Sequence, residues 1–187
     1  MRSRALRLSA GVLILAVLMA APGRAATEKS TWGIPGATFP LPGVMAAGQP
    51  TGEQIQLMVE EGGYRTVIDL RLPDEPRGFD EPEAARQIGL TYINIPVTPA
   101  TFDQATIDRF LAVFRKAERP VLLHCSNSSR AGGLLYAWLV LEKKEPAAKA
   151  LERARAAGLR SPEITERVQK LVAERQAASA KPAPRPR

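Results

Sequence analysis

The stretch that most constrains this fold runs from residue 120 to residue 132 and reads PVLLHCSNSSRAG. Its opening is an apolar run behind a proline, which is typical of a buried strand. An almost wholly apolar segment, residues 131–141, follows the polar loop and predicts a buried helix. The loop therefore connects the C-terminal end of a strand to the N-terminus of a helix. In open α/β sheets, ligands bind at that end of the strands.

The residues of this loop suit an anion and a nucleophile at one point. Backbone N–H groups of the loop and of the first helical turn converge there, and Arg130 adds a two-pronged donor for tetrahedral oxyanions. The same field favours the thiolate of Cys125 over its thiol. We therefore expect Cys125 and Arg130 to be catalytic. We expect the residues between them to bind substrate, namely Ser126, Asn127, Ser128 and Ser129, together with Arg130.

Two of these residues also have a structural interpretation. A lone cysteine after an apolar strand is often a buried and inert side chain, so this alternative applies to Cys125 when its neighbours are ignored. His124 is the only histidine in the chain. We expect it to orient the loop backbone rather than to transfer protons.

The remaining strand signals place this loop in a larger sheet. Residues 66–70 and 91–95 are β-branched, largely apolar runs, and residues 44–47 predict a short edge strand. Helical patterns separate these runs. The alternation predicts an α/β fold, with a mostly parallel central sheet flanked by helices in a single domain.

Helix boundaries are marked by capping residues. Thr51 with Gln54, and again Thr101 with Gln104, have the spacing of a capping box. The second of these precedes an apolar stripe at helical spacing, and Ser161 before Pro162 predicts the start of a last helix. The stripe consists of Ile107, Phe110, Leu111 and Phe114.

The N-terminus has the organisation of a targeting segment. Three arginines precede the apolar residues 8–21, and Pro22-Gly23-Arg24-Ala25 then supplies helix breakers and small residues. The apolar run is shorter than the roughly 20 residues that span a bilayer. We expect a signal peptide over residues 1–25 and a periplasmic or secreted mature protein without stable membrane insertion. An uncleaved anchor is the alternative.

Composition divides the rest of the chain into three parts. We expect an extended, Pro- and Gly-rich arm over residues 26–43, a catalytic domain over residues 44–176 and a disordered, basic, Pro-rich tail over residues 177–187. The net charge of +7 belongs to the two ends, because the leader carries four arginines without an acid and the tail three basic residues. The body is neutral, so we expect no nucleic-acid binding. We also expect no metal and no cofactor.

At this point several stretches resemble a known family. The chain is similar to the small bacterial cysteine-phosphatase-like domains of the dual-specificity and tyrosine phosphatase superfamily, in particular to the beta-lactamase-hydrolase-like group. The resemblance covers most of residues 44–160. It is carried by residues 47–50, 64–71, 92–97, 124–132 and 150–159.

This resemblance implies a mechanism and a general acid. It implies that Cys125 attacks phosphorus to give a phosphocysteine, that Arg130 and the loop amides hold the phosphoryl oxygens, and that water releases phosphate. The substrate would be a phosphorylated protein or small molecule. The loop after residues 95–97 normally offers an aspartic acid, and here only Asp103 is available.

The loop from Cys125 to Ala131 departs from the family pattern in three ways. Four residues rather than the superfamily's usual five separate Cys125 from Arg130, as in the bacterial group. Ser128 stands where a glycine is usual, and a left-handed backbone there costs a non-glycine residue roughly 1–2 kcal/mol. Ala131 replaces the hydroxyl residue that commonly follows the arginine.

Two other functions fit parts of the sequence. Four intervening residues is also the loop length of rhodanese-type sulfurtransferases, and residues 69–71 resemble their early strand. A non-catalytic module that binds phosphate or phosphopeptides is the third possibility. Polar residues after residues 66–70 are candidates for the rim of the site, although a solvated loop is the favoured interpretation for them. They are Asp69, Arg71, Asp74 and Glu75.

Protein exported by its native signal should begin at Ala26, because the charged, apolar and small-residue regions occur in the order that signal peptidase reads. Intact-mass analysis of the exported protein measures the new N-terminus. A chain that keeps residues 1–25 and fractionates with membranes would instead identify the segment as an anchor.

Overall fold

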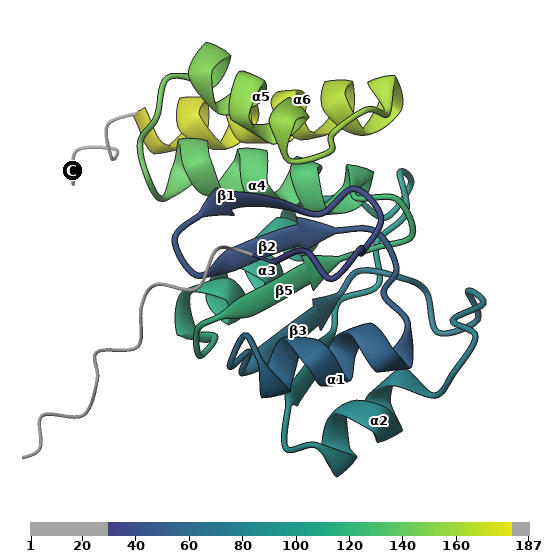
Figure 1. The fold of residues 1–187 in the computed structure, drawn as a ribbon. Helices are drawn as coiled ribbons and strands as arrows, with labels where there is room; N and C mark the ends of the chain where they lie inside the picture. The colour runs from purple at the N-terminus through teal and green to yellow at the C-terminus, as the bar shows by residue number, and fades with distance from the viewer. Residues whose placement is uncertain (1–29, 181–187) are drawn as a thin grey trace, which may run out of the picture.

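The computed structural model describes residues 30–180, so the signal peptide expected over residues 1–25 lies outside the described residues. Within that range the chain alternates short strands with helices around one sheet (Figure 1). The elements, in chain order, are β1 (Thr38–Leu41), β2 (Val44–Ala47), α1 (Gly52–Glu60), β3 (Thr66–Asp69), α2 (Glu81–Gln87), β4 (Thr91–Asn94), α3 (Gln104–Lys116), β5 (Val121–His124), α4 (Ser129–Leu141), α5 (Ala147–Ala156) and α6 (Pro162–Ala180).

The sheet is mostly parallel, as the alternation of strand and helix signals predicts. Its strand order is β1-β2-β5-β3-β4, and only the β1–β2 pair is antiparallel. The expectation that residues 44–47 form an edge strand is wrong, because β1 pairs with the outer side of β2. Part of the arm expected over residues 26–43 is thus a strand of the sheet. Proline and glycine around β1 weaken its strand signal in the sequence.

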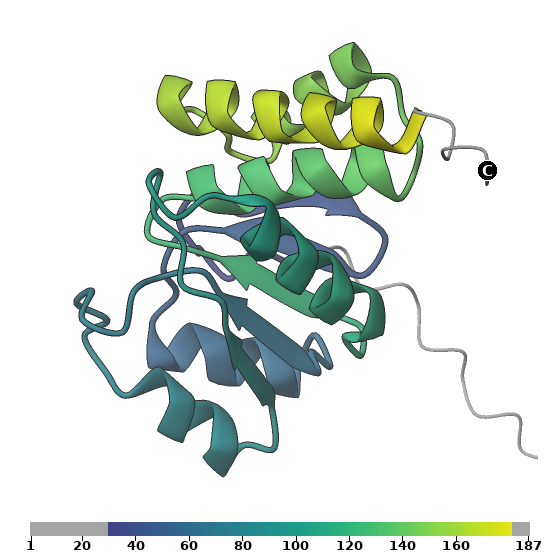
Figure 2. The same ribbon diagram turned by 180° about the vertical axis from the view of Figure 1, so that it is seen from behind.

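Helices cover both faces of the sheet (Figures 1 and 2). Alternate residues of a strand point to opposite faces, so each strand contributes to two cores. On β5, Leu122 packs with α1 and α2, whereas Val121 and Leu123 pack with α3 and α4. Helices α5 and α6 lie on the outer side of α4 and form a further layer.

Helix α4 is buried almost from end to end because it lies between the sheet and this outer layer. Two glycines permit the close approach. A Cβ on Gly132 would lie 2.6 Å from the backbone nitrogen of Leu159, and one on Gly133 would lie 2.7 Å from the side chain of Ile164. The turn between α5 and α6 is therefore held against the first turns of α4, next to the cysteine loop.

Most predicted helix starts agree with the structure. The capping box of Thr51 and Gln54 is complete, and Ser161 caps α6 by accepting a hydrogen bond from the N–H of Ile164. The box predicted at Thr101 and Gln104 is wrong, since Asp103 is the N-cap of α3. Thr101 instead exchanges hydrogen bonds with Thr98 in the preceding loop.

Helix α6 extends beyond the boundary expected at residue 176. It continues to Ala180, so the tail predicted over residues 177–187 begins inside a helix. Alanine has the highest helix propensity of all residues, which explains why the helix continues through this segment. In the part of the chain that the structure describes, no helix is long and apolar enough to cross a membrane.

Candidate active site

The structure places Cys125 where the sequence predicts it, between the end of β5 and the start of α4. The side chain is fully buried, and its backbone N–H donates to the carbonyl of Ala47 on β2 at 3.3 Å. Its Sγ lies 4.0 Å from Oδ1 of Asn127. The thiol is thus held at the carboxyl ends of parallel strands and before a helix N-terminus, where an anion is favoured.

The loop after Cys125 has an unusual backbone at Ser128. This residue has a φ of 71°, in the left-handed region, as expected from the glycine that usually stands there. Its side chain is buried, and its Oγ donates to the carbonyl of Gly36 at 3.4 Å. Room for the side chain exists because residue 158 is glycine: a Cβ on Gly158 would lie 2.4 Å from that of Ser128.

Two other loop residues fix their surroundings. Oδ1 of Asn127 accepts the N–H of Ser129 at 3.1 Å. The Ser129 hydroxyl in turn accepts the N–H groups of Arg160 and Ser161, at 3.1 and 2.9 Å. The loop is therefore joined to the α5–α6 turn by hydrogen bonds as well as by packing.

Arg130 is buried, and both of its terminal nitrogens donate hydrogen bonds. Its NH1 and NH2 groups donate to the two carboxylate oxygens of Glu75 at 2.5 and 2.7 Å. NH1 also donates to the carbonyls of Leu70 and Val97, and NH2 to Oγ of Ser126 at 3.0 Å. The guanidinium thus spans from the cysteine loop to the loops after β3 and β4.

Electrostatics in this cluster favour charged forms. Burial opposes the charge of Arg130, but Glu75 and Cys125 beside it raise its pKa. Hydrogen bonding from Arg130 holds the pKa of Glu75 at about 2, against the opposing effect of burial. Glu75 is therefore an ionised partner of Arg130 at neutral pH and not the solvated loop residue favoured by the sequence.

A hollow of about 240 Å³ lies over the loop. Of the predicted binding residues, Ser126, Asn127, Ser129 and Arg130 line it, whereas Ser128 is buried. The other walls were not predicted from the sequence, because they come from the loop after β4 and from the start of α6. They are Val97, Thr98 and Pro99 on one side and Ser161 and Ile164 on the other.

Asp103, the predicted general acid, has a different position. Its exposed carboxylate caps α3 by accepting the N–H of Thr106 at 2.7 Å, and it does not line the hollow. Hydrogen bonding to Thr106 lowers its pKa. The carboxylate is thus ionised and engaged, and the geometry gives no support to its role as a proton donor.

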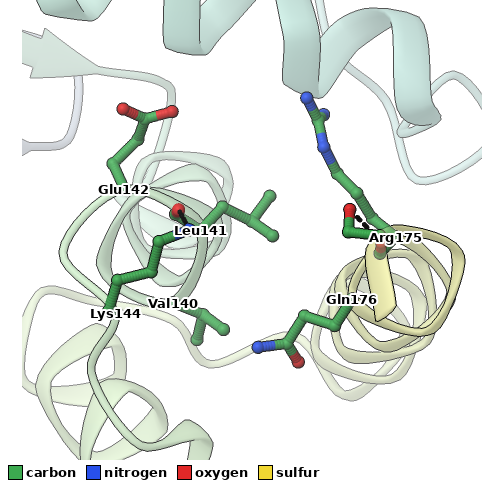
Figure 3. A pocket seen from close by; sticks show the side chains of 7 residues that line it. Val140, Leu141, Glu142, Lys144, Arg175 and Gln176 are labelled. Carbon is green, nitrogen blue, oxygen red and sulfur yellow. Dashed lines mark hydrogen bonds between the residues drawn. The ribbon is translucent and has the colours of Figure 1, made fainter. Parts of the chain in front are cut away.

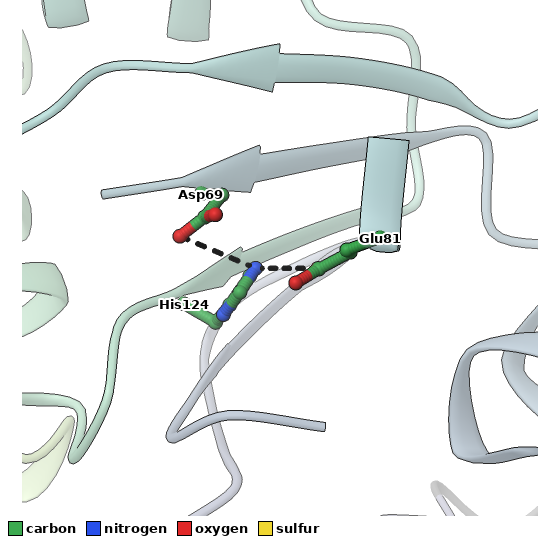
Figure 4. A group of neighbouring side chains, drawn as sticks. All are labelled: Asp69, Glu81 and His124. Atoms are coloured by element: carbon green, nitrogen blue, oxygen red, sulfur yellow. Dashed lines mark ion pairs between the residues drawn. The ribbon is translucent and has the colours of Figure 1, made fainter. Parts of the chain in front are cut away.

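His124 belongs to a buried group with Asp69 and Glu81 (Figure 4). Its Nε2 lies 2.9 Å from Oε1 of Glu81 and 3.8 Å from Oδ1 of Asp69. All three side chains are fully buried. This network fixes the residue that precedes Cys125, which agrees with an orienting role for His124.

The same three residues have the chemistry of metal ligands, and their donor atoms lie within 4.8 Å of one another. The oxygens of Asp69 are already used, however. Oδ1 accepts the N–H of Arg71, and Oδ2 accepts from Tyr92 at 2.8 Å and from Arg77 at 2.9 Å. A guanidinium at that distance also repels a cation. The group therefore fits an ion-pair network better than a metal centre.

A larger hollow, of about 500 Å³, lies at the opposite end of α4 (Figure 3). It has neither cysteine nor histidine, and Nζ of Lys144 is engaged with the carbonyl of Leu141. The nucleophile and its anion-binding groups are therefore at the other end of the helix. The residues that line this hollow are Val140, Leu141, Glu142, Lys144, Arg175, Gln176 and Ser179.

The geometry of cysteine, short loop and buried arginine agrees with a family match. Residues 43–171 match the family model described as DSP-PTPase phosphatase fused to NAD+ kinase. The chain belongs to this family. The resemblance to dual-specificity phosphatases is thereby confirmed, and the family assignment favours a phosphatase over a sulfurtransferase.

Relatives agree with the family assignment. A beta-lactamase hydrolase-like protein of Xylella fastidiosa (strain Temecula1) is 35% identical over 89 residues, which cover 46% of this chain and 20% of that protein. A beta-lactamase hydrolase-like protein of Agrobacterium fabrum is 33% identical over 89 residues, which again cover 46% of this chain and 20% of that protein. The chain therefore matches only about a fifth of the length of these relatives.

Solved structures show the same fold. A DUF442 protein from Shewanella putrefaciens CN-32 has a TM-score of 0.62 and 23% identity, over 78% of this chain and 92% of that one. PTPMT1, in complex with PI(5)P, has a TM-score of 0.65 and 17% identity, over 77% of this chain and 99% of its own. The predicted α/β architecture is that of the dual-specificity phosphatases.

Replacing Gly158 by alanine should destabilise the fold by about 1–3 kcal/mol, because the new Cβ overlaps that of Ser128. Urea unfolding measures the change. Gly89→Ala is the matched control, since Gly89 also has a positive φ, of 70°, but open space around it. Ser128→Gly should recover part of the loss in the double variant. Equal costs at Gly158 and Gly89 would contradict this contact.

The ion pair between Glu75 and Arg130 should make the free energy of unfolding depend on pH in the acidic range. The pKa of Glu75 falls from its ordinary value of 4.5 to about 2 on folding. Its contribution is therefore complete above pH 4.5 and is lost as the pH falls through about 2. Urea unfolding should show wild type more stable than Glu75→Gln by about 1–2 kcal/mol at pH 6, after allowance for partial exposure, with the gap closing in acid. A constant gap would contradict it.

Proposed function

We propose that this chain is a cysteine-dependent phosphatase that hydrolyses phosphate monoesters through a phosphocysteine intermediate. The observation that carries the proposal is the position of Arg130. Its guanidinium is oriented by Glu75 and two backbone carbonyls, and its NH2 group meets the cysteine loop at Ser126. The only thiol of the chain is fully buried and lies close enough to this guanidinium to raise the pKa of Arg130.

The first half-reaction forms a sulfur–phosphorus bond. The thiolate of Cys125 attacks phosphorus while the phosphate oxygens bind the loop amides and Arg130. The bond from phosphorus to the leaving oxygen breaks, and its electron pair stays on that oxygen. The N–H of Ser129 already donates to Asn127, so the other amides of the loop and first helical turn must supply most of the donors.

The second half-reaction regenerates the thiolate. Water attacks the phosphocysteine, the sulfur–phosphorus bond breaks with its electrons returning to sulfur, and phosphate leaves. Arg130 and the loop amides stabilise the charge in both half-reactions because they are fixed before the substrate binds.

Substrate and location follow as parts of the same proposal. The substrate is a phosphorylated protein or small molecule, with tyrosine or dual-specificity phosphatase activity on proteins. The N-terminal sequence supports a periplasmic or secreted enzyme. A non-catalytic phosphate-binding module remains the second candidate, favoured by Ser128 and Ala131 at positions that usually hold glycine and a hydroxyl residue.

Cys125→Ser should abolish hydrolysis of 4-nitrophenyl phosphate and leave phosphate binding intact, since a serine hydroxyl lacks the nucleophilicity of a thiolate while the anion-binding groups remain. Arg130→Lys should lose most of the hydrolysis and most of the phosphate binding, because the single ammonium of lysine cannot replace the paired donors of a planar guanidinium. Steady-state kinetics and calorimetric titration with inorganic phosphate measure the two properties.

Two results would contradict this proposal and favour another function. Wild-type protein that binds phosphate through Arg130 without hydrolysing any aryl phosphate is a binding module. Wild-type protein that forms a persulfide on Cys125 with thiosulfate and passes the sulfur to cyanide is a sulfurtransferase.

A further inference from the structure

We propose that the substrate is a phosphate whose leaving oxygen is stable as an anion, namely an acyl or aryl phosphate, because the carboxylates placed at this site are committed to other bonds. The inference rests on the proposed phosphatase function. It narrows the monoesters to aryl esters, leaves out the alkyl esters of serine and threonine, and adds acyl phosphates, which are anhydrides. It concerns the proton that an alkyl leaving group requires.

The two candidate carboxylates, Glu75 and Asp103, are both hydrogen-bond acceptors in use. Each oxygen of Glu75 accepts from Arg130, and an Arg130 that loses this partner is a buried, unpaired charge. Asp103 caps α3. A general acid must instead carry a proton and point at the leaving oxygen.

The buried network behind the loop does not supply the proton either. Asp69 accepts from Arg71, Arg77 and Tyr92, and Glu81 pairs with His124. His124, the only histidine of the chain, is fully buried. These groups hold the strand end in place and do not reach the hollow.

The hollow itself is lined by hydroxyl, amide and apolar groups and by Arg130. Among the described residues, those lining it include no carboxylic acid. Three exposed acids lie nearby. Asp74 belongs to the loop that carries Glu75, and Glu163 and Glu166 line a neighbouring hollow that shares Pro99. They are the residues that would overturn the inference if they acted as the acid.

The remaining reaction is transfer of the phosphoryl group to sulfur without protonation of the leaving oxygen. The thiolate forms its bond to phosphorus, and the leaving oxygen departs with the electron pair of the broken bond. A carboxylate or a phenoxide with an electron-withdrawing substituent is stable in that form. An alkoxide is not stable as an anion. Hydrolysis of an alkyl phosphate therefore lacks the roughly 100- to 10,000-fold rate acceleration that a general acid contributes.

The test is a leaving-group series with the full-length protein. Values of kcat/KM are measured for acetyl phosphate, 4-nitrophenyl phosphate, phenyl phosphate and glycerol phosphate. This ratio reports formation of the phosphocysteine, whereas kcat also contains its hydrolysis, which is common to all four. Acetyl and 4-nitrophenyl phosphate share a stable leaving anion but not a shape, so their agreement separates leaving-group chemistry from recognition of an aromatic ring.

We expect kcat/KM for acetyl and 4-nitrophenyl phosphate to exceed that for glycerol phosphate by about 100-fold or more, with the value for phenyl phosphate between them. Asp74→Asn, Asp103→Asn, Glu163→Gln and Glu166→Gln should each leave the whole series of kcat/KM values within twofold of wild type. Asparagine remains a good N-cap, so the Asp103 variant keeps α3 intact.

Two results would overturn the inference while the phosphatase proposal stands. One is glycerol phosphate turned over within tenfold of 4-nitrophenyl phosphate. The other is a variant that loses tenfold or more on phenyl phosphate and nothing on 4-nitrophenyl phosphate, because that residue is then the acid. Failure of all four substrates, with phosphate still bound, would refute the phosphatase proposal itself and the inference with it.

Discussion

The site depends on how one guanidinium is held. Arg130 projects from the first turn of α4, yet its acceptors come from the end of β3, the loop that follows β3 and the loop that follows β4. Removing Glu75 would leave this guanidinium buried and without its carboxylate partner. The arginine therefore fixes three segments relative to the cysteine loop. The same hydrogen bonds orient the guanidinium group before any phosphate binds, and such preorganisation is the condition for electrostatic catalysis.

The parallel sheet explains why these groups meet. Asp69 pairs in register with His124 on one side and with Asn94 on the other, so three strands end in the same row. Asn94 then donates its amide to the carbonyls of Asp69 and Arg71, which ties the loop after β3 to β4. Residues far apart in the chain thus reach one edge of the sheet. This is the carboxyl end of the parallel strands, where open α/β sheets bind their ligands.

Local patterns predicted most of the fold, because strands and helices here follow their periodicity. The loop from Cys125 to Arg130 was also predicted, since its strand and its helix are each apolar and contiguous. Glu75 was underestimated because 55 positions separate it from Arg130. Short-range spacing cannot show which polar residue of a loop turns inward. Thr101 and Asp103 are both good caps two positions apart, so only the observed hydrogen bonds distinguish them.

The shape of the cysteine loop is also a property of the turn against which it packs. A serine in the left-handed region costs roughly 1–2 kcal/mol, and here its side chain occupies space that exists only because residue 158 is glycine. The glycine that the loop itself lacks is thus present in the α5–α6 turn. That turn also donates two N–H groups to Ser129 and lines the hollow through Ser161. The outer helices therefore help to shape the anion site, although they lie beyond the sheet that carries the nucleophile.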